Sequence, residues 1–289
     1  MPKVLVIGVT GQVGSEIKEL STSYSEYEFV FADRKLIDLE NMEKNEDFFN
    51  HNAFDIIVNC AAYTAVDKAE NEPLIADRVN HQFVDFLAQT VKLQKAAFVH
   101  ISTDYVFDGK NYRPYVENDS TDPQGVYGRT KRDGESAILK AAPANTIIIR
   151  TSWVYSSKGN NFVKTMLRLG KDKDSLGVIF DQIGTPTYAR DLAKAILDIL
   201  PKIKNHKPEV YHFSNEGAAS WYDFAKSIFE FSQINCHLHP ITTDQYPTPA
   251  KRPHYSLLDK KKFKQDFDIV IPYWRESLYE CLKLLGECK

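Results

Sequence analysis

The chain has 289 residues, of which 43% are hydrophobic and 26% are charged, with 36 basic and 39 acidic residues and a formal net charge of −3. These are ordinary values for a globular protein, and a chain of this length can bury a large core as one domain or two. The slight acidic excess argues against a nucleic-acid partner, because such proteins normally carry a basic surplus.

The cysteines and the N-terminus predict a protein of a reducing compartment. The four cysteines are scattered and form no C-x-x-C pair, as expected of free thiols. The first apolar run, Val4–Ile7, stops at Gly8 and is too short for a signal peptide or a membrane span. We therefore expect a cytoplasmic protein that has no membrane contact.

Short apolar runs alternate with helical patterns along the chain. The runs are rich in Val, Ile and Phe and predict buried strands at Val4–Ile7, Phe29–Ala32, Ile56–Asn59, Ala97–Ile101, Thr146–Arg150, Leu176–Phe180 and Val210–Phe213. Apolar residues at helical spacing predict helices at Pro73 to about Gln94, Ala189–Leu200, Trp221–Phe231 and Pro272–Leu285. Pro73 suits the first turn of its helix.

This alternation predicts the α/β class, with a Rossmann-like, doubly wound parallel sheet and a smaller α/β substrate-binding region on its C-terminal side. We expect residues 1–150 to form the dinucleotide-binding domain, with 176–213 returning to it. Residues 151–289 should form mainly the substrate-binding region. In such sheets ligands bind beyond the carboxyl ends of the strands, so functional residues should directly follow strands.

A glycine-rich turn follows the first predicted strand and opens a helix. Its residues are Gly8, Gly11 and Gly14, with Gln12 and Val13 between them. Glycines let the backbone approach a pyrophosphate, and the helix N-terminus offers free N–H groups with a partial positive charge. A simple tight turn would need the same residues, but the position in the first βαβ unit favours cofactor binding.

The second predicted strand ends at Asp33 and Arg34, about 20 residues after the glycine turn. Asp33 suits the ribose hydroxyls of NADH, whereas Arg34 suits the 2′-phosphate of NADPH, so both cofactors stay open. Asp33 could also simply cap a turn. Further cofactor contacts are expected beside the adenine and after the third strand, at Asp38, Leu39, Ala62, Tyr63 and Thr64.

Tyr127 and Lys131 stand four residues apart, and on a helix they would project into one cleft. An ammonium beside a phenol favours the phenolate, so we expect Lys131 to lower the pKa of Tyr127 and make it a proton donor. Lys131 could also bind a ribose hydroxyl. A solvated surface pair is the plainer interpretation, but Thr103 at the end of the fourth predicted strand supplies a hydroxyl for the same substrate oxygen.

With these residues in place, the sequence resembles the dTDP-4-dehydrorhamnose reductases, a family of extended short-chain dehydrogenases. The G-x-x-G-x-x-G spacing is of that type, and the resemblance runs nearly from end to end. The segments that carry it are 9–14, 59–70, 102–107, 127–131, 150–155, 159–162, 181–182, 246–250 and 252–253.

The resemblance implies an NADPH- or NADH-dependent enzyme that reduces the C4 keto group of dTDP-4-dehydro-β-L-rhamnose, in the synthesis of dTDP-rhamnose for cell-wall polysaccharide. Tyr127 would donate the proton, with Lys131 and Thr103 completing the catalytic set. It also implies a sugar-nucleotide site formed by Thr103, Asp104, Trp153, Asn161, Gln182 and Arg252. On chemistry alone Trp153 could equally be core, and Arg252 could be a solvated loop residue.

Two features separate this chain from its rivals on the same scaffold. Sugar-nucleotide 4,6-dehydratases carry an Asp-Glu pair after the active-site Thr, whereas Thr103 is followed by Asp104 and Tyr105. A sugar-nucleotide epimerase remains an alternative. So does a non-catalytic subunit like the regulatory subunit of methionine adenosyltransferase, although the intact set of Thr103, Tyr127 and Lys131 favours an enzyme.

No metal requirement is expected. Some members of the family dimerise through a magnesium ion held by glutamates, and Glu16 matches one of those positions. Arg190 stands where a second carboxylate would be, and arginine cannot ligate a hard cation. We therefore expect no metal-bridged dimer, and either a monomer or a homodimer of another kind.

Overall fold

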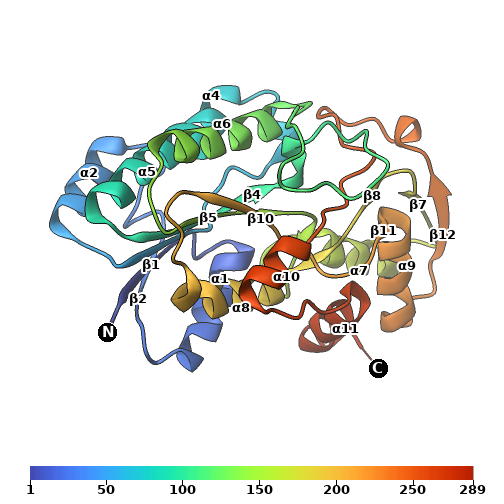
Figure 1. Ribbon diagram of the computed structural model, residues 1–289. Helices are drawn as coiled ribbons and strands as arrows, with labels where there is room; N and C mark the ends of the chain where they lie inside the picture. Colours follow the sequence, from blue (N-terminus) through green and yellow to red (C-terminus); the bar gives the residue numbers. More distant parts are fainter. Residues whose placement is uncertain (289) are drawn as a thin grey trace.

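A six-stranded parallel sheet forms the centre of the computed structural model, which describes residues 1–288 (Figure 1). Its strand order is β10-β5-β4-β3-β1-β2, so the chain starts in mid-sheet and winds outward in both directions, as predicted for a Rossmann-like fold. The strands are β1 (Lys3–Ile7), β2 (Glu28–Ala32), β3 (Ile56–Asn59), β4 (Ala97–Thr103), β5 (Thr146–Thr151) and β10 (Glu209–His212).

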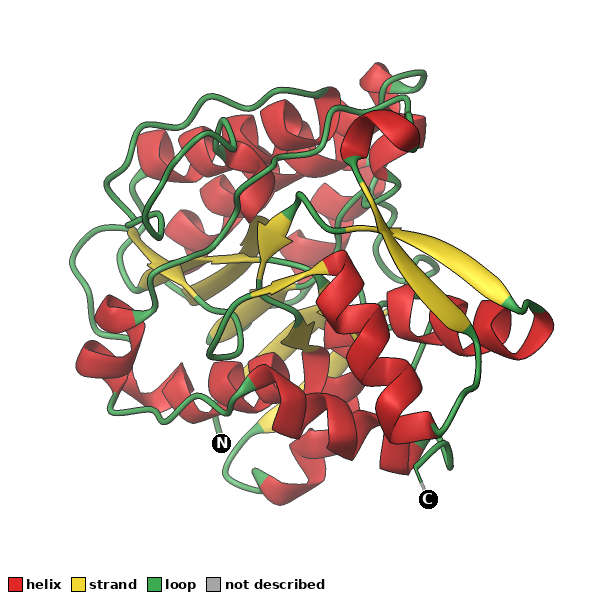
Figure 2. Ribbon diagram, turned by 90° about the vertical axis from the view of Figure 1, so that its right-hand side faces the viewer, coloured by secondary structure: helices red, strands yellow, loops and turns green. Residues whose placement is uncertain are grey.

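Helices cover both faces of this sheet (Figures 1 and 2). Strand β1 explains why both faces need cover: Val4 and Val6 enter one apolar core, and Leu5 and Ile7 enter the other. The first core is covered by α1 (Gln12–Leu20), α8 (Ala189–Ile199) and α10 (Lys261–Phe267), and the second by α2 (Met42–His51), α5 (Phe83–Gln94) and α6 (Val126–Ala141).

The helix predicted from Pro73 to about Gln94 is present but is not uniform. It consists of α4 (Pro73–Asp77), a π-helical turn (Arg78–Gln82) and α5. In the π turn Asn80 is buried, where its side chain binds both backbone groups of Tyr63 and the hydroxyl of Thr130. The π turn therefore places an amide that ties the segment after β3 to α6.

A smaller α/β region with its own apolar core lies beside the sheet, at the right of Figure 1. Its helices are α7 (Phe162–Asp172), α9 (Trp221–Ser232) and α11 (Trp274–Leu284). Its paired strands are β7 (Ser175–Ile179) with β12 (His237–Ile241), β6 (Val154–Tyr155) with β9 (Thr187–Tyr188), and β8 (Ile183–Gly184) with β11 (Ala219–Ser220). One further short helix, α3 (Val66–Ala69), follows β3.

Residues 176–213 do not all return to the central sheet as predicted. The strand predicted at Leu176–Phe180 is β7, which pairs with β12 in a separate two-stranded ribbon. Within this range α8 packs on the sheet and β10 joins its edge beside β5. An apolar run predicts a strand but not its partner, because pairing is decided by distant parts of the chain. The domain boundary near residue 150 stays a prediction.

No helix within residues 1–288 is both long enough and apolar enough to cross a membrane. The four cysteines are all free thiols.

Candidate active site

The glycine turn has the geometry that the sequence predicted. Gly8 has a φ of +83°, and a Cβ there would lie 2.6 Å from the backbone nitrogen of Ala61. A Cβ on Gly14 would lie 2.4 Å from the carbonyl oxygen of Gly8, so this turn closes only with glycine at both places. Gly11 is the N-cap of α1 and has no side chain to satisfy the first N–H groups of the helix. They are therefore available to an anion.

Two cavities meet above this turn, at the carboxyl ends of the strands. The first, of about 250 Å³, is lined by the ends of β1, β2 and β3. The second, of about 530 Å³, runs from the glycine turn to the ends of β4 and β5. Thr10, Gly11, Cys60, Ala62 and Thr64 line both cavities. A ligand as long as a dinucleotide would therefore find one continuous site.

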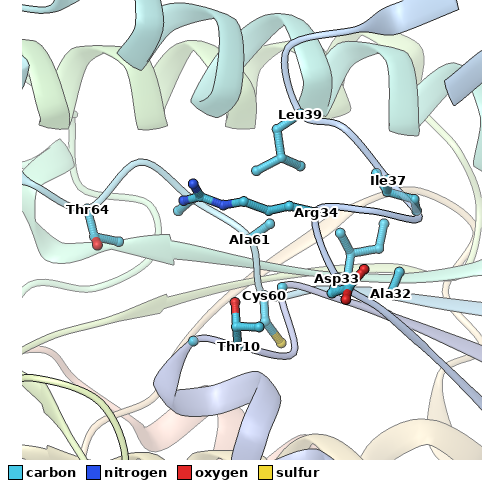
Figure 3. A pocket seen from close by; sticks show the side chains of 13 residues that line it. Thr10, Ala32, Asp33, Arg34, Ile37, Leu39, Cys60, Ala61 and Thr64 are labelled. Carbon is cyan, nitrogen blue, oxygen red and sulfur yellow. The ribbon is translucent and has the colours of Figure 1, made fainter. Parts of the chain in front are cut away.

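At the end of β2 the two candidate specificity residues behave differently. The Asp33 carboxylate accepts hydrogen bonds from the backbone nitrogens of Lys35 (2.9 Å) and Leu36 (3.2 Å), so it caps its own turn. Arg34 extends across the first cavity past Leu39 and toward the side of Thr64 (Figure 3). The cation, not the carboxylate, thus faces the ligand space most openly.

Most of the predicted cofactor residues line these cavities, and three do not. Those in the lining are Gly8, Gly11, Gln12, Val13, Asp33, Arg34, Leu39, Ala62, Thr64, Tyr127 and Lys131. Gly14 shapes the turn from below. Asp38 caps its own turn through the Glu40 nitrogen, and Tyr63 is turned away to Glu72 and packs beside Val126.

Thr103, Tyr127 and Lys131 come together in the second cavity. Thr103 ends β4, and its hydroxyl donates to the Asp104 carboxylate at 3.0 Å. Tyr127 and Lys131 lie one turn apart on α6, whose first free N–H, that of Val126, is capped by the Glu70 carboxylate at 2.8 Å. Glu70 thereby positions the start of the helix that presents the phenol.

The expected lowering of the Tyr127 pKa is wrong for this structure. Burial raises the pKa of the phenol, and the neighbouring Thr103 hydroxyl opposes that shift. Lys131 does not lower it, because its amine is turned to the carbonyl oxygen of Ile101 at 2.7 Å and to His100. Burial also lowers the pKa of Lys131, to about 8. Tyr127 is therefore held in its protonated form, as suits an acid.

Asp104 is a buried carboxylate in the same cavity, and its Oδ2 has no hydrogen-bond partner among the described residues. Burial raises its pKa from 3.8 to about 6, while the neighbouring Ser256 and Thr103 hydroxyls oppose the shift. A buried acceptor that lacks a partner is costly to the fold and available to a ligand hydroxyl.

We expect Asp104→Asn to raise the free energy of unfolding at pH 7 by about 3 kcal/mol, since the shift is from 3.8 to about 6 and one pKa unit corresponds to about 1.4 kcal/mol. The folded-state pKa lies above the unfolded one, so the unfolded chain ionises first and the contribution of Asp104 to stability falls as the pH rises from about 4 to 6. Urea unfolding across this range tests the expectation. The stability gain of the variant over the wild type should grow across this range, and a gain that does not change with pH would contradict the prediction.

The predicted substrate residues surround the second cavity and a third. Trp153 lines the second, where it adopts a left-handed φ of +47° and stacks on Trp221 with 3.7 Å between ring centroids. The third cavity, of about 420 Å³, lies between α7, β7 and α9 and is lined by Gln182, Trp221, Tyr246 and Arg252 among others. Gln182 accepts from the Trp221 indole at 3.2 Å.

Two of these residues are also bound within the fold. Asn161 caps α7 through the Lys164 nitrogen and donates to the Gln12 side chain at 3.0 Å, so it joins the glycine turn to the smaller region. Arg252 pairs with Asp67 at 2.7 Å and lies 3.3 Å from the Tyr105 hydroxyl. It is therefore no freely solvated loop residue.

Glu16 lies in a protein-internal ion pair. It is fully buried, and its two oxygens bind the Ser156 hydroxyl at 2.6 Å and the Arg190 guanidinium at 3.0 Å. Arg190 also pairs with Glu19 at 2.6 Å.

Trp221 and Glu70 were not predicted as parts of the site. The Trp153–Trp221 stack joins residues far apart in the sequence, and no local sequence pattern predicts such a pair. Glu70 belongs to a recognised segment of the sequence, but nothing there indicated that it caps a helix beginning at Val126.

Comparison with known proteins identifies the family. The family described as RmlD substrate binding domain matches residues 2–286. Spore coat polysaccharide biosynthesis protein SpsK of Bacillus subtilis (strain 168) is 40% identical, over 98% of this chain and 98% of that protein. The dTDP-4-dehydrorhamnose reductase of Aggregatibacter actinomycetemcomitans is 41% identical, over 96% and 97%.

Solved structures agree. A dTDP-4-dehydrorhamnose reductase from Clostridium acetobutylicum superimposes with a TM-score of 0.94 at 39% identity, covering 98% of this chain and 99% of that one. The enzyme from Bacillus anthracis, in complex with NADP, gives 0.92 at 35% identity, with the same coverage. The UDP-Glc/GlcNAc 4-epimerase of Campylobacter jejuni (0.78, 18% identity, 98% and 100%) shares the fold alone. This chain belongs to the dTDP-4-dehydrorhamnose reductase family.

Proposed function

We propose that this protein reduces the C4 keto group of dTDP-4-dehydro-β-L-rhamnose to give dTDP-L-rhamnose, with NADPH or NADH as the reductant and Tyr127 as the proton donor. The observation that carries the proposal is the second cavity. It joins an uncapped helix N-terminus, suited to a pyrophosphate, to Thr103, Tyr127 and Lys131. The family relatives named above support the choice of substrate.

The residues of the first two cavities fit a nicotinamide dinucleotide. The pyrophosphate would lie on the N–H groups of Gln12 and Val13, where the helix dipole favours negative charge. Arg34 faces the space for an adenosine ribose, and Lys131 faces the space beyond the glycine turn, where it would bind the nicotinamide ribose. The bound nicotinamide supplies a hydride to C4 of the sugar.

In the mechanism that we propose, Tyr127 donates its phenolic proton to the keto oxygen as the C4–H bond forms, so the carbonyl becomes a hydroxyl. Burial keeps the phenol protonated until that moment. Thr103 lies beside it to orient the oxygen. Asp104 offers its unpartnered Oδ2 to a hydroxyl of the sugar, which would relieve the cost of a buried acceptor.

The nucleotide half of the substrate would occupy the third cavity. Its lining by Phe162, Trp221 and Tyr246 suits a flat base, and Gln182 and Arg252 add polar groups. Arg252 would bind the diphosphate while its pairing with Asp67 fixes its direction. Trp153, stacked on Trp221, lies between this cavity and the phenol and would form a wall of the sugar site.

The direct test follows loss of reduced nicotinamide with dTDP-4-dehydrorhamnose, with both cofactors in parallel. We expect one nicotinamide to be consumed per product formed. An epimerase or a dehydratase would regenerate its cofactor, and a regulatory subunit would give no turnover. Either outcome would overturn the proposal.

We predict that NADPH is the better cofactor and that Arg34 is the reason. Arg34→Ala should raise the KM for NADPH on the order of 10-fold, because it removes the charge that faces the 2′-phosphate, and should leave the KM for NADH within about twofold. Lys35→Ala, which alters a neighbouring exposed cation outside the cavity lining, is the matched control. Equal losses with both cofactors would contradict the prediction.

We expect activity to survive EDTA. The Arg190 guanidinium already neutralises Glu16, which matches a magnesium-binding position of some relatives, so a side-chain cation stands there in place of a metal ion. Turnover measured before and after chelation, and again with added magnesium, checks this. Loss on chelation with recovery in magnesium would show the prediction to be wrong.

We also propose a cytoplasmic location, a dTDP-sugar as the partner molecule, and a monomer or a homodimer as the assembly. The four free thiols support a reducing compartment. Size-exclusion chromatography with light scattering would decide the assembly.

A further inference from the structure

A buried histidine that the proposed reaction does not use lies directly behind Lys131. His100 is on β4 and is 0% exposed. Its Nε2 is 3.3 Å from the Lys131 Nζ, and its Nδ1 is 3.1 Å from the Asn59 Nδ2. The same amine donates to the Ile101 carbonyl oxygen at 2.7 Å. The contacts form a chain from β3 through β4 to the lysine of α6.

Asn59 decides which nitrogen of His100 carries the proton. The Ala61 backbone N–H donates to the Asn59 Oδ1 at 3.0 Å, so the amide oxygen faces Ala61 and the NH₂ group faces His100. An NH₂ group can only donate, so the Nδ1 of His100 must present its lone pair. Burial lowers the pKa of His100 well below its ordinary value, so the ring is neutral. Its one proton is therefore on Nε2, and it points at Lys131.

A neutral amine has one lone pair and two hydrogens, and the surroundings of Lys131 match this set of one acceptor and two donors. The lone pair accepts from His100, one hydrogen goes to Ile101, and the other is left for the cavity. An ammonium has three hydrogens and no lone pair, so one of its hydrogens would confront the His100 N–H. We propose that His100 is a positioning residue which, held by Asn59 as the Nε2–H tautomer, donates a hydrogen bond to Lys131 and favours the proton-free amine.

The other ionisable groups that face the amine do not cancel this effect. Glu135, one turn further along α6, favours the ammonium, but its carboxylate is already paired with Arg150 of β5 at 2.7 Å. Tyr127, one turn earlier, is neutral because burial raises its pKa. His100 on β4 is therefore the neighbour whose hydrogen bond selects between the two forms of Lys131.

The consequence for turnover rests on the proposed function. Lys131 in its protonated form has three hydrogens, one more than the amine, with which to bind the nicotinamide ribose, so the reductive rate should fall as the pH rises through the Lys131 pKa. His100 would thus set the basic limb of the pH–rate profile.

The first test reads the tautomer directly and needs no substrate. In long-range proton–nitrogen NMR spectra of ¹⁵N-histidine-labelled protein, His100 should show a protonated Nε2 and a bare Nδ1, unchanged from about pH 6 to 9. His212 is the internal control: it is also buried, but its Nδ1 faces the Tyr115 carbonyl oxygen at 3.1 Å and must carry the proton. The spectrum of a His100→Leu variant assigns the signals. A bare Nε2 on His100 would overturn the inference.

The second test changes the pKa of Lys131 through its neighbours. Asn59→Asp replaces one donor by an acceptor of equal size, which should switch His100 to the Nδ1–H tautomer and turn a lone pair toward Lys131. His100→Leu removes the N–H without adding a charge. In both variants the basic limb of kcat/KM should shift upward, by about one pH unit. A lower rate with an unmoved limb would mean a merely structural role and would overturn the inference. If the wild type lacks reductase activity the proposed function fails, while the tautomer result stands by itself.

Discussion

Tyr127→Phe should reduce turnover on the order of 100-fold or more while the protein still binds its cofactor. The substitution removes one oxygen atom from a side chain that lines the second cavity beside Thr103. The keto oxygen would then develop negative charge without a positioned proton donor. The glycine turn and the uncapped start of α1 are untouched by this change, so the dinucleotide should still bind.

Two measurements separate chemistry from binding. Steady-state rates with dTDP-4-dehydrorhamnose give the turnover number, and fluorescence titration with NADPH gives the dissociation constant. Tyr211→Phe is the control, because it removes a phenol oxygen bonded to Asp266 in the sheet core, away from the cavities. Unchanged turnover in the Tyr127 variant would remove Tyr127 from the mechanism, and weakened NADPH binding would make its role one of cofactor binding.

Much of the fold could be predicted because parallel strands that are covered on both faces have a distinctive composition. The predicted runs at Val4–Ile7, Ile56–Asn59 and Thr146–Arg150 are all central strands, buried throughout or nearly so. Leu176–Phe180 has a similar pattern but forms part of the outer ribbon, where it pairs with β12. Nothing local distinguishes the two environments.

The site was predictable as far as the topology dictates it. The glycine turn, Thr103 and Ala62 follow parallel strands, and such strands all end at one edge of the sheet. Asp38 and Tyr63 are in the right segments but point elsewhere, because each meets a closer hydrogen-bond partner. The direction of a side chain depends on partners brought from other elements. The sequence alone could not supply those partners, as the His100–Asn59 contact also illustrates.

The Glu135–Arg150 pair ties together the three elements that frame the proposed catalytic set. Both side chains are almost fully buried, and the Arg150 guanidinium donates two hydrogen bonds, of 2.7 and 3.2 Å, to one carboxylate oxygen. The same carboxylate accepts from Ser102 on β4, one residue before Thr103. Since Glu135 is on α6 and Arg150 on β5, this ion pair holds the helix of Tyr127 against the strand ends.

Glu135→Leu should therefore lower the free energy of unfolding by about 3–5 kcal/mol, because it leaves a buried guanidinium without its counter-charge. Arg150→Met should cost a similar amount for the opposite reason, whereas the double variant should lose much less than the sum, since neither charge is then stranded. Urea unfolding of the four proteins gives the coupling energy. Strictly additive losses would show that the two groups do not depend on each other. Turnover of the double variant then shows whether the ion pair also serves the chemistry. If the apolar Leu–Met pair of the double variant restores stability but not turnover, the Glu135–Arg150 ion pair serves to position Tyr127 beside Thr103 and not to stabilise the fold.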